Sequence, residues 1–302
     1  MVLVDKDESL GGVCLNRGCI PSKALLHLSK LIGEAKEAKN KGVNFGKPEI
    51  NIAEIRKWKN AIISNLSSGI SQLSKARKVK IVTGEARFQS TNEIEIKNRK
   101  LDLCISFEKA IIATGSVSEN IPTLPKDSDR IMGSKQALNL SSIPKKLLVV
   151  GGGYIGLEMG SVYCALGSKV TIVEMLPQLL TGVDQDLVKP LQKKLSRQLE
   201  NIYLNSTLVF GEETKKGFYV KLKTPNGEVL DIYEKILVCV GRRPNTDKLG
   251  LESIDIEGDE KGFLPADEFQ RTSISNIYAI GDVAGNPMLA HKAAYELSLI
   301  HI

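Results

Sequence analysis

Hydrophobic positions in the first part of the chain fall into strand-like and helical patterns. Residues 2–5 (VLVD) form a short apolar run that ends in an acid and predicts a strand. A polar, glycine-rich stretch predicts a loop after it. Helical spacing then runs from Ser22 to about Asn40, and Gly42 follows as a stop signal. The apolar positions of this helix are Leu25, Leu28, Leu31, Ile32 and Ala35.

A second helical pattern begins near Asn51, which together with Glu54 has approximately the spacing of a capping box. Strand patterns follow this helix at 79–83, 93–96 and 110–114. The apolar positions of the helix, which we expect to face a core, are Ile55, Trp58, Ile62, Leu66, Ile70 and Leu73.

From Lys145 the pattern changes to strand, glycine turn, helix and strand, and strand-like stretches follow a further helix near 184–199. A βαβ unit followed by hairpins predicts a compact domain over roughly 143–265. The last segment contains the strand NIYAIGD and is similar in pattern to the first part of the chain. We therefore predict an α/β protein of two Rossmann-like, three-layer domains. Residues 1–142 and 266–302 would form one domain, into which 143–265 are inserted.

Residues 151–156 (GGGYIG) match the dinucleotide-binding pattern G-x-G-x-x-G. The pattern alone is weak, but here it follows an apolar strand, opens a helix and precedes Glu174 at the end of the next strand. Glycines allow a tight turn and close approach to a pyrophosphate, whose negative charge a helix N-terminus favours. Glu174 would accept hydrogen bonds from ribose hydroxyls and repel a 2′-phosphate, which favours NAD over NADP. A glycine turn with a purely structural role is the alternative.

Asp5 ends a strand as the acid of the second strand in a dinucleotide-binding unit does. A first strand with its own glycine motif about 30 residues upstream is absent from this sequence. Gly11 and Gly12 cannot supply that motif, because they follow the acid. Asp5 is therefore either an ordinary loop acid or a sign that the sequence is truncated at its front.

Cys14 and Cys19 are separated by the four residues LNRG. A zinc site needs a second pair of ligands, which the sequence does not offer, so we expect no metal. A disulfide needs Cα atoms within about 7 Å, whereas an ideal helix places residues five apart at roughly 8–9 Å. The segment must therefore depart from a helix if the pair is to close, and Gly18 would permit this. A redox pair, whose thiolate Arg17 and Lys23 would favour, and two buried free thiols are the alternatives.

Composition limits the classes of protein that remain. Five cysteines without an export signal argue against a disulfide framework, and we expect Cys104, Cys164 and Cys239 to be core thiols. The net charge of +6 comes from scattered lysines and aromatic residues are only 5%, so we expect no nucleic-acid partner. Apolar runs are shorter than the roughly 18 residues of a membrane span. We expect a cytoplasmic protein, or a mitochondrial matrix protein in a eukaryote.

Residues 11–26 (GGVCLNRGCIPSKALL) resemble the redox-disulfide motif of the pyridine nucleotide–disulfide oxidoreductases. Further motifs similar to those of the family follow in the same order. They are 113–116 (ATGS), 151–158 (GGGYIGLE), 241–245 (GRRPN) and 279–282 (AIGD). Within the family, the similarity is greatest to the members that oxidise dihydrolipoamide with NAD.

The resemblance implies roles for individual residues. Cys14 would exchange with the substrate, Cys19 would contact the flavin, and Lys23 would lie near the flavin ring and pair with Glu158. These four residues are the implied catalytic set. The implied FAD-binding residues are Asp5, Lys23, Ala86, Gly115, Asp282 and Ala290. The implied NAD-binding residues are Gly151, Gly153, Gly156, Glu174, Val209 and Gly241.

The implied activity is oxidation of dihydrolipoamide, carried on a lipoyl domain, with FAD and NAD as cofactors. Electrons would pass from dihydrolipoamide to the cysteine pair, then to FAD and as hydride to NAD. Members of this type serve 2-oxo acid dehydrogenase complexes as homodimers. The alternatives are another NAD(P)H-dependent disulfide or metal-ion reductase, such as mercuric reductase, and a non-catalytic nucleotide-binding protein. The presence of both cysteines with Lys23 and Glu158 disfavours the non-catalytic protein.

Two departures from the family pattern affect these expectations. The family's C-terminal dimerisation domain, with a histidine that acts as a base toward the cysteines, would follow residue 302, and neither His27 nor His291 replaces it. Residues 297–302 (LSLIHI) stand where a glycine-containing helix is expected. We therefore expect a sequence truncated at both ends, which by itself would bind FAD poorly and catalyse little.

Overall fold

The computed structural model describes residues 1–98, 102–125 and 127–300 of the chain. The chain forms two compact units that alternate along the sequence. Unit 1 is made of Met1–Gly12, Ser67–Ser118 and Arg242–Ile302, and unit 2 of Val13–Leu66 and Glu119–Gly241. Both units mix helices with strands, so the predicted α/β class is confirmed. The domain boundaries at 142 and 265 stay a prediction.

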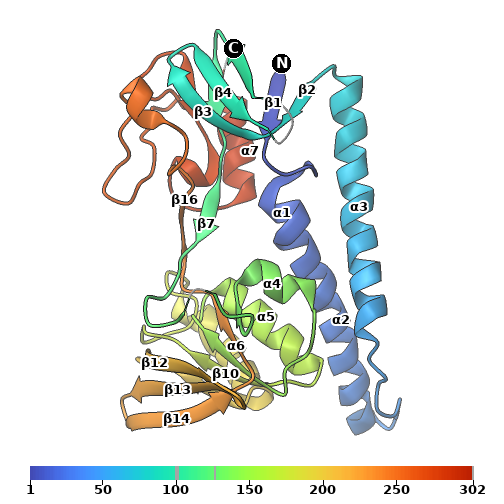
Figure 1. Cartoon of the computed structure of the whole chain (residues 1–302). Coiled ribbons are helices and arrows are strands. Elements are labelled where there is room, and N and C mark those ends of the chain that lie inside the picture. The colour runs from blue at the N-terminus through green and yellow to red at the C-terminus, as the bar shows by residue number, and fades with distance from the viewer. Residues whose placement is uncertain (99–101, 126, 301–302) are drawn as a thin grey trace. The chain divides into compact units, whose positions relative to one another are not determined.

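The centre of unit 2 is a parallel sheet with the strand order β11-β10-β9-β15-β8. Helices α4, α5 and α6 and the antiparallel sheet β12-β13-β14 complete this part of unit 2 (Figure 1). The strands are β8 (Ile131–Met132), β9 (Lys146–Val150), β10 (Lys169–Val173), β11 (Asn201–Tyr203), β12 (Thr207–Thr214), β13 (Gly217–Thr224), β14 (Gly227–Tyr233) and β15 (Lys235–Val238). The helices are α4 (Ser134–Asn139), α5 (Tyr154–Ala165) and α6 (Gln185–Gln198).

Strand β9 is apolar at four consecutive positions, Leu147 to Val150, and does not alternate. Leu147 and Val149 belong to the hydrophobic cluster that also contains residues of α5 and α6. Leu148 and Val150 point the other way, into the cluster formed with β12, β13 and β14. Since successive side chains of a strand lie on opposite faces, a strand covered on both faces is apolar at every position. Unit 2 therefore has the three layers that the sequence predicted.

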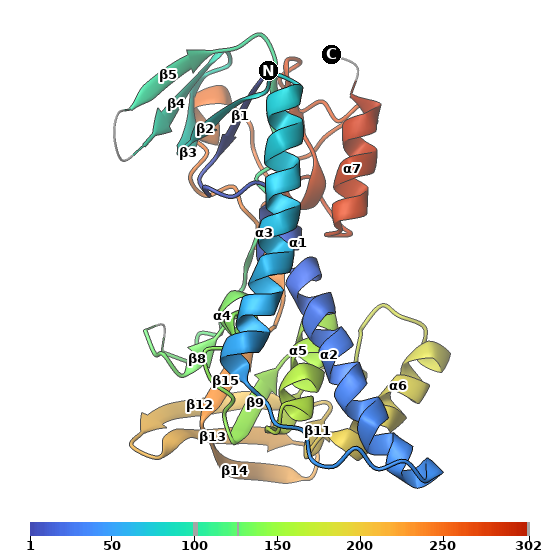
Figure 2. The ribbon, with the colours of Figure 1, turned by 90° about the vertical axis from the view of Figure 1, so that its right-hand side faces the viewer.

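The cysteine segment forms helices α1 (Gly12–Arg17) and α2 (Cys19–Ala38). The prediction of a loop up to Ser22 is therefore wrong from Gly12 onward. Buried Leu15 and Leu25 anchor the two helices, and Figures 1 and 2 both show α2 beside α5. A short 3-10 helix (Lys39–Lys41) follows α2.

The long helix α3 (Ile52–Ala76) begins at its predicted cap. Asn51 Oδ1 accepts hydrogen bonds from the backbone N–H groups of Ala53 and Glu54, at 3.1 and 3.2 Å. The expectation that its whole apolar stripe faces a core is wrong. Trp58, Leu66 and Leu73 are 41%, 44% and 53% exposed.

The described residues of unit 1 form four small sheets and a separate core that includes Phe88, Ile112, Leu264 and Ile277. Parallel pairs join β1 (Val2–Asp5) to β2 (Lys80–Thr83) and β6 (Ala110–Ile112) to β17 (Ile277–Ala279). Strands β3 (Glu85–Ser90), β4 (Glu93–Lys97) and β5 (Leu103–Ser106) form an antiparallel sheet, and β7 (Ser116–Ser118) pairs antiparallel with β16 (Arg242–Pro244). The remaining elements are the 3-10 helices Leu251–Ile254 and Gly281–Val283 and helix α7 (Ala290–Leu299).

The three cysteines outside the pair, and the absence of a membrane span, were also predicted from the sequence. Cys104 lies exposed on β5, so the prediction of a core thiol there is wrong. The other two thiols are half-buried, and burial raises the pKa of Cys239 to about 12. None of the helices in the described part of the chain combines the length and apolar character needed to cross a lipid bilayer.

Candidate functional site

Cys14 and Cys19 lie on either side of the break between α1 and α2. Gly18 is the residue at the break, with φ −145° and ψ −114°, outside the helical region. A Cβ on Gly18 would lie 2.9 Å from the carbonyl oxygen of Val13, so only glycine lets the chain pass this closely. The predicted departure from helix at Gly18 is therefore confirmed.

The two cysteines are thiols in this structure, and the Cys14 thiol makes a side-chain hydrogen bond with Cys19. Cys14 is half-buried and Cys19 is exposed. The structure thus places Cys14 and Cys19 close enough to interact across the break at Gly18, as a pair that exchanges a disulfide for two thiols must be placed. Cys19, the more exposed of the two, is the cysteine that the resemblance assigns to the flavin.

The sequence predicts that nearby cations favour a thiolate in the cysteine pair, and at Cys14 other causes outweigh this effect. Burial, followed by the hydrogen bond with Cys19, raises the pKa of Cys14 to about 11. Lys23 acts in the opposite direction, but it is the weakest of the causes. Loss of hydration disfavours the charged form more than one solvated cation favours it. The Cys14 side chain is therefore a protonated thiol at neutral pH.

Lys23 and Glu158 form the ion pair that the sequence predicted. Lys23 lies on α2, one turn after Cys19, and Glu158 lies on the neighbouring helix α5. The Nζ atom of Lys23 donates to Oε1 of Glu158 at 2.5 Å. The lysine side chain is 61% exposed and the carboxylate 23% exposed, so the contact fixes a position more than it stabilises the fold.

The glycine loop of residues 151–156 lies between β9 and α5. Gly151 has φ +108°, and a Cβ there would lie 2.2 Å from the carbonyl oxygen of Cys239. A Cβ on Gly156 would lie 2.2 Å from the carbonyl oxygen of Gly151. Gly153 caps the N-terminus of α5, and a Cβ there would meet no atom within 4 Å. The loop is thus closed on the protein side and open at the helix N-terminus, which fits a pyrophosphate.

Glu174 follows β10 and is bonded to this loop. Its Oε2 accepts from the Gly152 N–H at 2.6 Å and its Oε1 from the Leu176 N–H at 2.9 Å. Each carboxylate oxygen can accept a second hydrogen bond, so the group remains able to receive ribose hydroxyls. Gly241 has φ +133° after β15, while Val209 is 44% exposed at an irregularity in β12. Their predicted NAD contacts stay predictions.

The residues predicted to bind FAD through unit 1 include two carboxylates that follow parallel strands. Asp5 ends β1, and its Oδ1 accepts from the N–H of Asp7 at 3.0 Å. Gly115 and Asp282 each stand three residues beyond the paired strand ends Ile112 and Ala279. The carboxyl ends of parallel strands are where open α/β sheets bind ligands. This set of acceptors fits the hydroxyl groups of a flavin nucleotide.

Ala86 and Ala290 lie elsewhere in unit 1. Ala86 pairs with Ile96 within the β3–β4 ladder, and Ala290 is the exposed first residue of α7. Their side chains carry no polar group, so any contact with a cofactor would use the backbone.

Sequence reasoning missed a hydrogen-bonded chain that ends on Asp282. Ser116 donates its hydroxyl proton to Oδ2 of Asp282, and Arg242 Nε donates to Ser116 Oγ at 2.8 Å. Ser116 and Arg242 belong to the motifs ATGS and GRRPN, and this membership was the one sign in the sequence that they could contribute to the site. Nothing in the spacing of three distant segments indicates that they meet.

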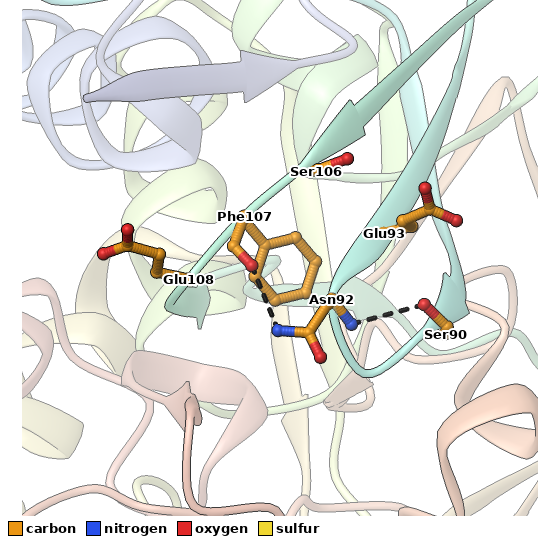
Figure 3. Close-up of a pocket in the computed structure, with 6 residues that line it drawn as sticks. All are labelled: Ser90, Asn92, Glu93, Ser106, Phe107 and Glu108. Carbon is orange, nitrogen blue, oxygen red and sulfur yellow. Dashed lines mark hydrogen bonds between the residues drawn. The ribbon is translucent and has the colours of Figure 1, made fainter.

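Two hollows among the described residues are lined by none of the predicted site residues. One, of about 440 Å³, lies at the end of the β3–β4–β5 sheet, where Asn92 Nδ2 donates to the Phe107 carbonyl and the Asn92 N–H donates to Ser90 Oγ (Figure 3). The other, of about 370 Å³, lies between α2 and α3. The first is lined by Ser90, Asn92, Glu93, Ser106, Phe107 and Glu108, and the second by His27, Leu28, Leu31, Glu54, Ile55 and Trp58.

The fold and these residues define an α/β nucleotide-binding protein with a pair of neighbouring thiols, and comparisons with known proteins agree. The family model "Pyridine nucleotide-disulphide oxidoreductase" matches residues 1–296. The chain belongs to this family, whose members use FAD and NAD.

Among curated proteins, the chain is 46% identical over 297 residues to a dihydrolipoyl dehydrogenase of Buchnera aphidicola subsp. Schizaphis graminum. It is 41% identical over 296 residues to the dihydrolipoyl dehydrogenase of Vibrio cholerae. Each match covers 98% of this chain and 62% of the relative.

Among solved structures, the chain is similar to the Cu(II) complex of the HOCl-induced flavoprotein disulfide reductase RclA from Escherichia coli. The TM-score is 0.85 and the sequence identity 25%, over 98% of this chain and 63% of that chain. The likeness extends over both units, and it confirms the predicted fold class.

Proposed function

We propose that this chain carries the redox and nucleotide-binding parts of an enzyme that oxidises dihydrolipoamide to lipoamide and reduces NAD. The observation that carries the proposal is the contact between the Cys14 and Cys19 thiols at the interrupted helix. The relatives named dihydrolipoyl dehydrogenase support the choice of substrate. The open glycine loop and Glu174 support NAD as the electron acceptor.

The protein's thiols would perform the substrate step. In the oxidised protein the two sulfurs are joined, and a thiolate of dihydrolipoamide attacks Cys14, so that Cys19 leaves as a thiolate. The second substrate thiol then attacks its own sulfur in the mixed disulfide and releases Cys14. Dihydrolipoamide has thereby lost two electrons and two protons and become lipoamide, and the cysteine pair has become a dithiol. When bound, FAD and NAD supply the carriers that remove these two electrons.

The remaining predicted residues would bind and orient. Lys23, held by Glu158, would place a cation near the flavin ring. Asp5, Gly115 and Asp282, with the backbones of Ala86 and Ala290, would bind FAD. Gly151, Gly153, Gly156, Glu174, Val209 and Gly241 would bind NAD. We further propose a homodimer that acts on a lipoyl domain of a 2-oxo acid dehydrogenase complex in the cytoplasm, or in the mitochondrial matrix of a eukaryote.

The full-length protein is expected to be yellow and to form NADH from NAD when dihydrolipoamide is supplied. The absorbance of NADH, followed with and without dihydrolipoamide, measures this activity. Oxidised glutathione with NADPH serves as the comparison, because Glu174 would disfavour a 2′-phosphate. A protein that turns over the comparison pair and leaves dihydrolipoamide unchanged would contradict the proposal.

A further inference from the structure

Asp282 is held by a hydrogen-bonded chain whose direction is fixed by chemistry. A guanidinium group can only donate hydrogen bonds, so Arg242 Nε–H is the donor and Ser116 Oγ the acceptor of the bond between them. The Ser116 hydroxyl, which accepts from arginine, donates its own hydrogen bond to Oδ2 of Asp282. No other order of donors and acceptors satisfies the three groups.

The serine in the middle of this chain has little freedom to move. Ser116 is 6% exposed and is the first residue of β7. Arg242 makes two hydrogen bonds to Ser116, because its Nη2 also donates to the Ser116 carbonyl oxygen at 2.7 Å. The two residues belong to strands that pair directly, with Arg242 aligned to Ser118. A fork of two N–H groups on one residue fixes orientation better than a single contact.

The backbone of Gly281, which precedes Asp282, is held by two residues of α7. The Gly281 N–H donates to Glu296 Oε2 at 2.7 Å, and Lys292 Nζ donates to the Gly281 carbonyl at 3.0 Å. Lys292 and Glu296 are themselves paired at 2.6 Å, with side chains only 16% and 11% exposed. The backbone at Asp282 is therefore fixed by α7 and its side chain by Ser116.

This arrangement leaves one oxygen of Asp282 for a ligand. Among the residues that the structure describes, none donates a hydrogen bond to Oδ1, although Oδ2 is engaged. The Asp282 side chain is only partly buried, so this oxygen can be reached. A carboxylate held in this way presents Oδ1 as an acceptor in a fixed orientation, as pre-organised recognition of a hydroxyl group requires.

We propose that Ser116 and Arg242 are positioning residues for FAD, which act by orienting Asp282 so that its Oδ1 receives a flavin hydroxyl. The proposal rests on the proposed function, which assigns Asp282 to FAD. The proposal adds two residues that act through Asp282 and not by touching the flavin. Each has a place in the hydrogen-bonded chain that ends on Asp282.

A double-mutant cycle on FAD affinity tests this in the full-length protein. Apoprotein is titrated with FAD, and quenching of flavin fluorescence gives the Kd for wild type, Ser116→Ala, Asp282→Ala and the double variant. We expect Ser116→Ala to weaken FAD binding about tenfold in the wild-type background, which is the effect of a hydrogen bond to a charged group. In the Asp282→Ala background the same change is expected to alter the Kd less than about twofold, because the serine then has nothing to orient.

Ser118→Ala is the matched control. Ser118 lies on the same strand and contacts the same guanidinium at 3.5 Å, but on the exposed side, without reaching Asp282. It is expected to leave the FAD affinity unchanged. NAD affinity, measured on the same proteins, is expected to stay constant throughout.

The outcomes separate a failure of the positioning role from a failure of the proposed function. Equal losses from Ser116→Ala in both backgrounds, or no loss in wild type, would overturn the positioning role while leaving the proposed function in place. If Ser116→Ala does not fold, Arg242→Gln is carried through the same cycle, and additivity there overturns the role as well. A full-length wild type that binds no FAD at all refutes the proposed function, and the positioning role with it.

Discussion

Replacement of Cys19 by serine in the full-length protein is expected to abolish the oxidation of dihydrolipoamide with NAD. The hydroxyl oxygen of serine cannot form or exchange a disulfide, so the substrate loses its route for electrons. We expect turnover to fall on the order of a thousandfold or more, as it does when a covalent nucleophile is removed. Cys14→Ser is expected to have the same effect. NADH formation with dihydrolipoamide measures both.

Binding of FAD should survive these substitutions, because the predicted FAD residues of unit 1 do not depend on the thiols. NADH is therefore still expected to bleach the flavin absorbance of Cys19→Ser. Cys104→Ser is the control, since Cys104 is exposed on β5 and belongs to no predicted site. Normal turnover of dihydrolipoamide in either Cys14→Ser or Cys19→Ser would refute the role of the pair.

Replacement of Gly156 by alanine is expected to weaken NAD binding about a hundredfold, the effect of displacing a binding group by roughly 1 Å. A Cβ at this position would lie 2.2 Å from the carbonyl oxygen of Gly151 and 3.1 Å from Val149. The glycine loop must then move away from α5, and the backbone N–H groups at the helix N-terminus lose their alignment with the pyrophosphate. The Kd of NAD, obtained by titration of the full-length protein, measures the effect.

Gly160→Ala is the matched control for this experiment. Gly160 lies one turn further along the same helix and is also buried, but a Cβ there would meet its nearest atom at 3.5 Å, an ordinary contact. Because alanine favours helix over glycine, this variant is expected to unfold at the same or a higher temperature. NAD affinity that is equal in Gly156→Ala and Gly160→Ala would contradict the role of the loop.

Much of unit 2 could be predicted from the sequence because its local signals agree with its packing. The apolar run of β9, the glycine turn and the helix after it correspond to β9, the loop 151–156 and α5. The predictions that failed concern elements whose structure depends on tertiary contacts. Helix α1 is only six residues long, too short to be stable alone, and is anchored by the burial of Leu15. The apolar stripe of α3 predicted a helix correctly, but periodicity does not say which of its positions are covered.

The candidate site was predictable only in part for a similar reason. The need for a break at Gly18 follows from helix geometry, and the structure has it. The Lys23–Glu158 pair joins residues 135 positions apart, and it was predicted through the family resemblance alone. The chain from Arg242 through Ser116 to Asp282 joins three segments and was not predicted. The raised pKa of Cys14 depends on burial, which the charges of its sequence neighbours do not indicate.

The most direct test asks whether Cys14 and Cys19 close into a bond. The native full-length protein is oxidised, unfolded in the presence of an alkylating reagent and cleaved after Arg17, which separates the two cysteines into different peptides. Mass spectrometry is expected to find these peptides joined, and to find them apart after reduction. Recovery of both peptides separately alkylated from the oxidised protein would contradict the account.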